Sequence, residues 1–173
     1  QVLLDGSSPV LGSLTLSKTL IFTNWSTILT ATNVTILNGG TVTVANAFTT
    51  NQMSNRVYVV CETLTVNAGG RIDVSARGYA GVLNEHGQGP GRGTGITDGS
   101  GGGYGGGGGL GVKTNEGGAV YGTASEPTDP GSSGAGSSTS PGGHGGGAVR
   151  IEAAGAVVVG NAIWRTKSWL GTG

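Results

Sequence analysis

The sequence predicts an all-β protein with a short parallel β-helix or β-roll at its core and an inserted polyglycine segment. From Leu14 to Val74, apolar residues occupy alternate positions, so each strand has one inward and one outward face. These runs are rich in Val, Ile and Thr, which favour a pleated strand over a helix. Between Gly87 and Gly147, 26 residues are glycine, and a stretch so poor in side chains cannot build an ordinary hydrophobic core.

The spacing of the alternating runs favours stacked strands. Equivalent apolar positions follow one another in steps of eight, fifteen, seven and eight residues, at Val34, Val42, Val57, Leu64 and Ile72. Fifteen is close to twice the short step. Short strands at near-regular spacing are typical of successive faces of a parallel β-helix or roll.

The turns between these runs leave a second architecture open. Asn-Gly-Gly at 38–40 and Asn-Ala-Gly-Gly at 67–70 suit the corners of a β-helix, but Asn and Gly also favour tight antiparallel hairpins. The alternative is therefore a jelly-roll-like β-sandwich. The β-helix is preferred because sandwich strands usually stand further apart.

The glycine-rich segment has two competing structures, a disordered linker and glycine strands in an extended threefold helix. Isolated larger residues interrupt the glycines and are expected to anchor an ordered segment: Tyr79, Tyr104, Leu110, Val120 and Tyr121. Alternation resumes in AVRIEAAGAVVV, so the segment is an insertion between strands. The interpretation is one domain, with a strand-rich region at 1–83, a glycine-rich insertion at 84–147 packed on the core, and closing strands at 148–173.

Several sequence segments resemble a family of bacterial and environmental extracellular surface proteins with β-solenoid rungs and glycine-rich motifs. The segments are ETLTVNAGGRIDVSARGYAG, GGGYGGGGG, GGAVYGTASEPTDPGSSG and GGHGGGAVRIEAAGAVVV, over about the last two thirds of the chain. Phage tail-tip glycine-rich adhesins are a weaker resemblance. The family implies a role in adhesion or in an extracellular matrix.

The charge pattern and the ends of the sequence constrain location and partners. Nine Lys and Arg balance nine Asp and Glu without runs, so no nucleic-acid partner is expected. No stretch of 18 apolar residues predicts a membrane span. The sequence begins with Gln1, and removal of a signal peptide is the simplest interpretation, which predicts an extracellular or cell-surface location.

No catalytic or cofactor site is predicted. Cys61 is interpreted as a small buried hydrophobe, and with only His86 and His144 beside it there is no zinc set. The acids within the strands, Glu62 and Asp73, are expected to be solvated partners of arginine rather than a catalytic pair. The chain is therefore predicted not to be an enzyme and to need no cofactor.

Two sequons, Asn24-Trp25-Ser26 and Asn33-Val34-Thr35, make Asn24 and Asn33 candidate glycosylation sites. The alternative is that both are ordinary strand or turn positions. Because Asn33 precedes Val34 in an alternating run, its side chain is expected to point outward when Val34 is in the core.

The candidates for contact with a partner are aromatic and basic residues: Tyr79, Tyr104, Tyr121, His86, Arg92 and His144. For the tyrosines, packing between glycine strands is the alternative. Near the C-terminus, Trp164 and Trp169 lie in an alternating run that is expected to add to the sheet edge of a neighbour, and Val2 to Leu4 is a second such strand. The alternative is that both ends cap their own solenoid.

These observations predict an extracellular structural protein, a subunit of a self-assembling surface fibre or layer without catalysis. It is expected to form a homo-oligomer or polymer through its terminal strands. The alternative function is an adhesin or receptor-binding tip that recognises a glycan or a cell-surface protein.

Overall fold

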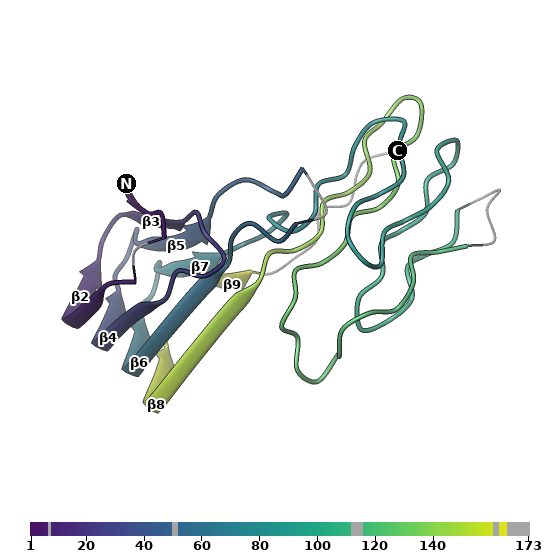
Figure 1. Ribbon diagram of the computed structural model, residues 1–173. Coiled ribbons are helices and arrows are strands. Elements are labelled where there is room, and N and C mark those ends of the chain that lie inside the picture. The colour runs from purple at the N-terminus through teal and green to yellow at the C-terminus, as the bar shows by residue number, and fades with distance from the viewer. Residues whose placement is uncertain (7, 50–51, 112–115, 161–162, 166–173) are drawn as a thin grey trace. The chain divides into compact units, whose positions relative to one another are not determined.

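The structure is a computed structural model that describes residues 1–6, 8–49, 52–111, 116–160 and 163–165 (Figure 1). Its named elements within these residues are nine strands, without a helix, which confirms the predicted all-β class. The strands are β1 (Val2–Leu4), β2 (Val10–Leu16), β3 (Thr19–Phe22), β4 (Leu29–Ile36), β5 (Thr41–Val44), β6 (Val57–Val66), β7 (Arg71–Asp73), β8 (Val149–Val159) and β9 (Ile163–Arg165).

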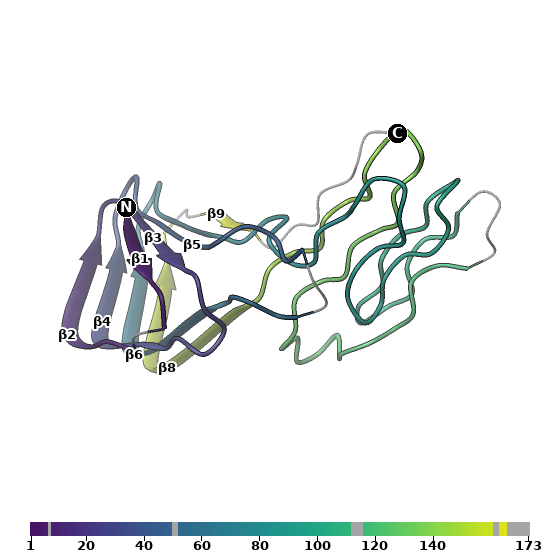
Figure 2. The ribbon, with the colours of Figure 1, turned by 45° about the horizontal axis from the view of Figure 1, so that its top comes forward.

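The strands form two sheets in which all seven ladders of the described strands are parallel. One sheet has the order β1-β3-β5-β7-β9 and the other the order β2-β4-β6-β8. The chain thus alternates between the sheets and advances by one strand in each, an arrangement consistent with a β-helix or roll-like class (Figure 2). The antiparallel pairing of a jelly-roll sandwich does not occur among these ladders.

The alternating sequence builds columns of inward-facing side chains across the sheets. Leu14, Val34, Leu64 and Val157 are register partners on β2, β4, β6 and β8. Val34 and Leu64, on the two inner strands, are 2% and 1% exposed. Such a column buries a branched apolar side chain at each layer, which stabilises the stack by about 1.5 to 3 kcal/mol for each fully buried residue.

The long strands change phase once along their length. Thr32 and Asn33 on β4 are both exposed, although strict alternation would bury one of them. Glu62 and Thr63 repeat this change on β6, and on β8 an extra residue produces a β-bulge between the partners of Cys61 and Thr63. The phase change lets both halves of each strand place apolar residues inward.

The Asn-Gly turns connect the two sheets and do not form hairpins. Residues 37–40 join β4 to β5, and residues 67–70 join β6 to β7. A Cβ atom at Gly40 would lie 2.4 Å from the carbonyl oxygen of Leu16, so only glycine allows this turn to stack on the preceding one. Gly39 has a φ of 79°, which favours glycine for a second reason.

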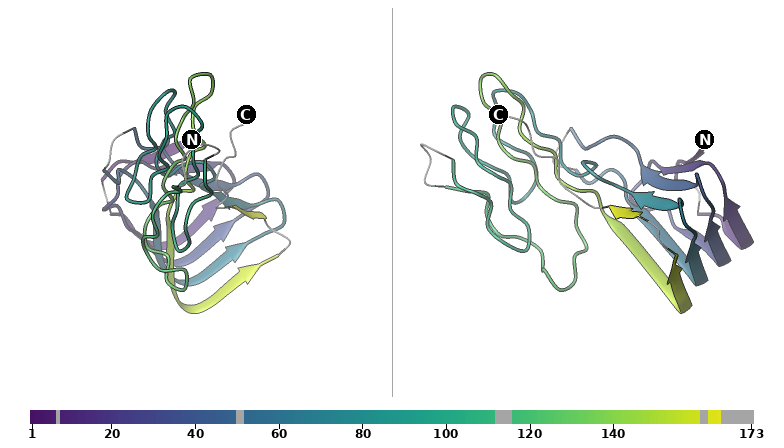
Figure 3. Two further views of the ribbon diagram at one scale, coloured as in Figure 1. Left: turned by 90° about the vertical axis from the view of Figure 1, so that its right-hand side faces the viewer. Right: turned by 180° about the vertical axis from the view of Figure 1, so that it is seen from behind.

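The chain forms two compact units. The strand unit comprises Gln1–Ala45, Ser54–Asp73 and Val149–Arg165. The glycine unit includes Asn46–Met53 and Val74–Ala148. In the strand unit, β8 lies at one edge of its sheet and is drawn in yellow in Figure 3.

Backbone hydrogen bonds join segments of the glycine unit, whose described residues contain no named strand. Three segments that hydrogen-bond to one another are residues 78–81, 131–136 and 142–146. The amide of Gly78 donates to the carbonyl of Gly145 at 2.8 Å, and the amide of Gly131 donates to Gly146 at the same distance. The glycine-rich stretch is therefore organised by main-chain contacts.

Glycine is required where these segments approach one another. A Cβ atom at Gly145 would lie 1.7 Å from the carbonyl oxygen of Gly131. A Cβ atom at Gly81 would lie 1.8 Å from the oxygen of Gly142. Gly78 and Gly81 are three residues apart, as are Gly142 and Gly145, so in these two segments the close approaches are three residues apart.

The expected anchors of the glycine unit behave in two ways. Tyr79 is 1% exposed and packs edge-to-face on Phe48, with ring centroids 5.3 Å apart. Tyr104 and Tyr121 are half-buried and form a second edge-to-face pair at 4.8 Å. The expectation is wrong for Leu110 and Val120, which are 69% and 61% exposed and anchor nothing.

Candidate functional site

The strand unit exposes apolar residues at the outer strands of its sheets. At one end they are Val2, Leu3, Val10 and Leu11 on β1 and β2, exposed by 38% to 79%. At the other end they are Val157, Val158 and Val159 on β8, exposed by 46% to 51%. β2 and β8 are the outer strands of the four-stranded sheet, so each has a backbone edge without a ladder partner among the described strands.

The exposed ends belong to the same columns that form the core. Val157 is 50% exposed at the end of a column whose inner members are almost fully buried. Val159 is 46% exposed, although its column partners Ile36 and Val66 are 0% and 2% exposed. Each column therefore ends in a side chain that one further layer would bury.

A cluster of aromatic and charged side chains lies on the outward side of β6 and β8. The guanidinium of Arg56 lies 4.8 Å from the ring centroid of Trp25 and 4.7 Å from that of Tyr58. Arg150 lies 4.9 Å from the Tyr58 ring, and the Tyr58 hydroxyl donates a hydrogen bond to Glu152 at 2.9 Å. Cation–π contacts of this kind order a surface patch without burying it.

The charges of this cluster perturb one another. The hydrogen bond with Glu152 raises the pKa of Tyr58, and the same bond, together with one from Arg150, lowers the pKa of Glu152. Partial burial, and then the charge of Arg150, lower the pKa of Arg56. Near neutral pH the cluster therefore holds two guanidinium groups, one carboxylate and a neutral tyrosine.

Sequence analysis did not identify this cluster. Tyr58 and Glu152 are 94 residues apart, and the glycine-rich stretch separates their strands. The available signal was the position of Tyr58 and Arg150 on the outward side of two alternating runs. Only the register of β6 with β8 makes them neighbours.

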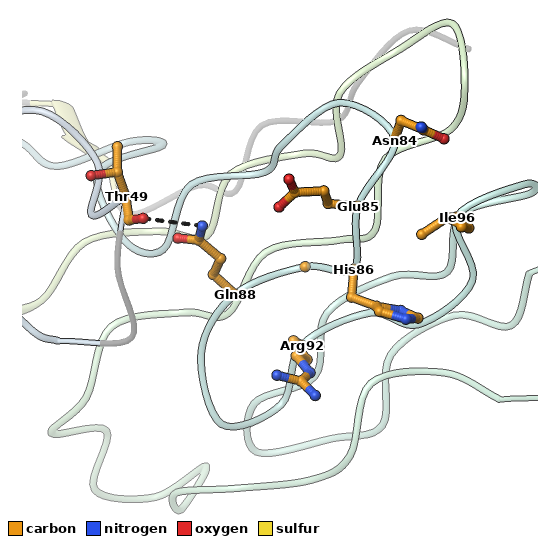
Figure 4. A pocket seen from close by; sticks show the side chains of 8 residues that line it. Thr49, Asn84, Glu85, His86, Gln88, Arg92 and Ile96 are labelled. Atoms are coloured by element: carbon orange, nitrogen blue, oxygen red, sulfur yellow. Dashed lines mark hydrogen bonds between the residues drawn. The ribbon is translucent and has the colours of Figure 1, made fainter.

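A pocket of about 470 Å³ lies within the glycine unit (Figure 4). His86 and Arg92, two predicted contact residues, both line it, together with Glu85 and Gln88. The Gln88 amide donates to the carbonyl oxygen of Thr49 at 3.2 Å, whereas its Oε1 atom is buried and lacks a hydrogen-bond partner among the described residues. The pocket thus offers the guanidinium of Arg92 and the carboxylate of Glu85 to a polar ligand.

His144 is separate from this pocket. It lines a second hollow of about 480 Å³, together with Arg77 and Asn46. Its Nδ1 atom accepts a hydrogen bond from the amide of Gly81 at 3.2 Å. His144 therefore has a structural contact within the glycine unit in addition to its place at the surface.

The two sequon asparagines are exposed. Asn33 points away from the core while Val34 is 2% exposed, as alternation predicts. The Oδ1 atom of Asn24 accepts hydrogen bonds from the amide of Ser26 at 2.9 Å and from its hydroxyl at 2.7 Å. Glycosylation of Asn24 and Asn33 stays a prediction.

The three candidate contact tyrosines occupy different environments. Tyr79 is buried, so its ring has no surface for a partner, and burial raises its pKa. Tyr121 donates a hydrogen bond from its hydroxyl to the carbonyl oxygen of Pro130, and burial raises its pKa to about 12. Tyr104 packs on Tyr121, and its hydroxyl accepts a bond from the amide of Asp129 at 3.3 Å. Packing is thus a role of all three rings.

The predicted C-terminal assembly strand is described only in part. Trp164 lies in β9, which pairs with β7 of the same chain, in register with Ile72. Trp169 lies outside the described residues. Its contact with a neighbour stays a prediction.

The residues considered for catalysis or metal binding do not form a site within the described residues. Glu62 is exposed, and Cys61 is 5% exposed with a pKa raised by burial, as expected of a small core residue. Within the described ranges, no three His, Cys, Asp or Glu side chains gather as a metal site would require. In the same ranges, no helix has the length and apolar character needed to cross a membrane.

Comparison of the chain with models of known protein families, with curated proteins and with solved structures finds no match.

Proposed function

We propose that the protein is an extracellular structural subunit whose copies join end to end into a fibre or layer, without catalysis. The observation that carries the proposal is the exposure of apolar residues on the outer strands β1, β2 and β8 of the strand unit. An unpaired strand edge that also exposes valine and leucine is a ready template for another strand. The extracellular location rests on the sequence resemblance.

The energetics of such a junction favour association. Burying a half-exposed valine or leucine is worth about 1 kcal/mol, and each β2 or β8 edge exposes several of them. A new ladder also satisfies backbone groups along the edge. Because each subunit has two different ends, the contact is head-to-tail and leads to open chains when the rotation does not close a ring.

We further infer the finer architecture of both units. The alternation of the chain between two parallel sheets supports successive turns of a β-helix or roll. The three-residue spacing of close approaches at Gly78 and Gly81, and at Gly142 and Gly145, supports extended threefold helices in these segments of the glycine unit. Both features would give a subunit whose backbone hydrogen bonds resist pulling and proteolysis.

Sedimentation and electron microscopy of the purified chain test the proposal. Filaments or a series of oligomers that grow with concentration are expected. Val157→Asp places a charge at the end of a core column and should suppress them, whereas Thr32→Asp, on the exposed face of an inner strand, should not. A wild-type chain that remains monomeric at every concentration would contradict the proposal.

A second candidate function is recognition of a glycan by the glycine unit. The pocket lined by Glu85, His86 and Arg92 favours it, because sugars are held by several polar groups at once. The test is binding of oligosaccharides to the wild-type chain and to Arg92→Ala by titration calorimetry. Glycan-specific binding that is lost in the variant is expected, and equal binding by both would exclude this pocket.

A further inference from the structure

The two sheets of the strand unit differ by one strand at the N-terminal end. The short turns join β2 to β3, β4 to β5, β6 to β7 and β8 to β9, so each of these pairs makes one layer. β1 pairs with β3 and has no companion in the four-stranded sheet among the described strands. It therefore projects one layer beyond β2.

This mismatch creates a conflict when two copies meet end to end. Suppose that β2 of the next copy pairs with β8 of the first. Strands β2 and β3 of the next copy then form the layer after β8 and β9, and β1 of the next copy falls in the position that β9 of the first copy occupies. If β9 instead stays and pairs with the incoming β1, β8 and the incoming β2 are separated by two strand spacings, about 9.6 Å. That arrangement leaves the facing backbone groups of both strands without partners.

We propose that copies assemble by strand exchange: β1 of the next copy takes the place of β9 beside β7, while β2 of that copy pairs with β8. The inference rests on the proposed function and names its contact. It makes both sheets continuous across the junction, with one strand for each layer in each sheet. Every ladder then keeps the parallel direction found within the chain.

The side chains of the core columns fit this exchange. Val2 is the register partner of Leu20, whose column continues through Val42 to Ile72, and Ile72 is the register partner of Trp164 on β9. After the exchange, Val2 of the next copy becomes the register partner of Ile72, the position that Trp164 holds in the single chain. Val2 of the next copy then connects the apolar column that ends at Ile72 in the first copy with the column that begins at Leu20 in the next copy.

The second sheet gains a ladder in the same step. Leu14 of the next copy becomes the register partner of Val157, and Leu16 of the next copy becomes the partner of Val159. Within one chain, each of these two pairs already belongs to a single column. All four side chains are partly or largely exposed before assembly.

The balance of hydrogen bonds favours the exchange. β9 and β1 each have three residues, so replacing one by the other beside β7 leaves that ladder about equal in length. In the other sheet, the seven-residue β2 gains β8 as a partner that it lacks in the single chain. The exchange therefore adds the ladder between β2 and β8, and it keeps a ladder of equal length beside β7.

Disulfide crosslinking tests the ladder between β2 and β8. Ser13 and Ala156 are exposed and share one column, separated within a chain by β4 and β6, or about 14 Å between outer strands. Ser13→Cys with Ala156→Cys should form crosslinked oligomers under mild oxidation. Ser13→Cys with Val158→Cys, offset by two residues, should give about tenfold fewer, because a disulfide requires Cα atoms about 4.4–6.8 Å apart. The wild-type chain, whose only cysteine is the buried Cys61, is the background control.

A second pair tests the exchange itself. Leu3 of the next copy would lie beside Asp73, whose backbone register partner in the single chain is residue 165 of β9. Leu3→Cys with Asp73→Cys should therefore crosslink copies to each other. If β9 keeps its place, this pair and the Ser13 and Ala156 pair both remain about 9.6 Å apart and neither reacts.

The outcomes separate the two proposals. Both crosslinks in oligomers support the exchange. Oligomers with neither crosslink, or with the first alone, overturn the exchange and leave end-to-end assembly standing. Variants that fold, as judged by circular dichroism, and stay monomeric together with the wild type overturn both, and this includes the case in which another segment of the same chain covers β8.

Discussion

The strand unit and the glycine unit differ in what fills the space between neighbouring chain segments. In the strand unit, columns such as Val34 and Leu64 fill it with branched side chains, between strands held by regular ladders. In the glycine unit, carbonyl oxygens approach so closely that a Cβ atom at Gly145 would lie 1.7 Å from one of them. The first unit depends on the presence of side chains and the second on their absence.

The comparison shows that one chain can reach close packing in two ways. Apolar burial stabilises the strand unit in proportion to the area removed from water. The glycine unit buries few large side chains, among them Phe48 and Tyr79, and satisfies its backbone by hydrogen bonds between irregular segments. The two units should therefore be sensitive to opposite kinds of substitution. Removing side-chain atoms should destabilise the strand unit, and adding one carbon atom should destabilise the glycine unit.

The largest effect is expected from adding a methyl group at the closest approach of the glycine unit. Gly145→Ala should lower the free energy of unfolding of this unit by more than about 4 kcal/mol, because the segments must separate to admit the Cβ atom. Amide hydrogen exchange should show faster exchange in the glycine unit. Gly107→Ala, where no atom lies within 4 Å of the added carbon, is the matched control and should exchange like the wild type.

The second effect concerns a cavity in the strand unit. Leu64→Ala, in the middle of a core column, should lower the free energy of unfolding by about 2 to 5 kcal/mol. Leu14→Ala, at the half-buried end of the same column, should cost less than half as much in the monomer. Equal losses in urea titrations of the two variants would show that the column ends are already covered.

The third effect is a pH dependence of the glycine unit. Burial raises the pKa of Tyr121 to about 12, above the ordinary value of 10. Its neutral form is thus favoured by folding, and this contribution is fully present below pH 10 and is lost as the pH rises toward 12. Relative to Tyr121→Phe, the wild type should keep a constant stability difference below pH 10 and then lose stability more steeply. Parallel stability curves for the two proteins up to pH 12 would contradict it.

The smallest effect is expected at the exposed cluster. Arg56→Ala removes the cation between Trp25 and Tyr58 and should lower the free energy of unfolding by about 0.5 to 1 kcal/mol. Intrinsic tryptophan fluorescence should report the change, since the environment of Trp25 is altered. Arg92→Ala, whose side chain is exposed in the glycine unit, is the control for loss of an arginine and should leave both quantities unchanged.

The sequence by itself determined which residues of the strands face inward. Period-two alternation identifies Val34, Leu64 and Ile72 as core positions, because successive side chains of a strand point to opposite faces. It also identified the glycine-rich stretch as a separate kind of structure. Local chemistry was sufficient for these predictions, since each depends only on residues close together in the chain.

Tertiary structure alone decided how the strands pair and where surface residues meet. The Asn-Gly turns suit hairpins as well as corners, and only the parallel register excludes the hairpin. Tyr58 and Glu152 meet because β6 and β8 become neighbours across a long insertion. Leu110 and Tyr79 both interrupt glycines, yet one is exposed and the other buried, because burial depends on which segments fold over a residue. Contacts between distant segments are set by the whole fold, and no local pattern encodes them.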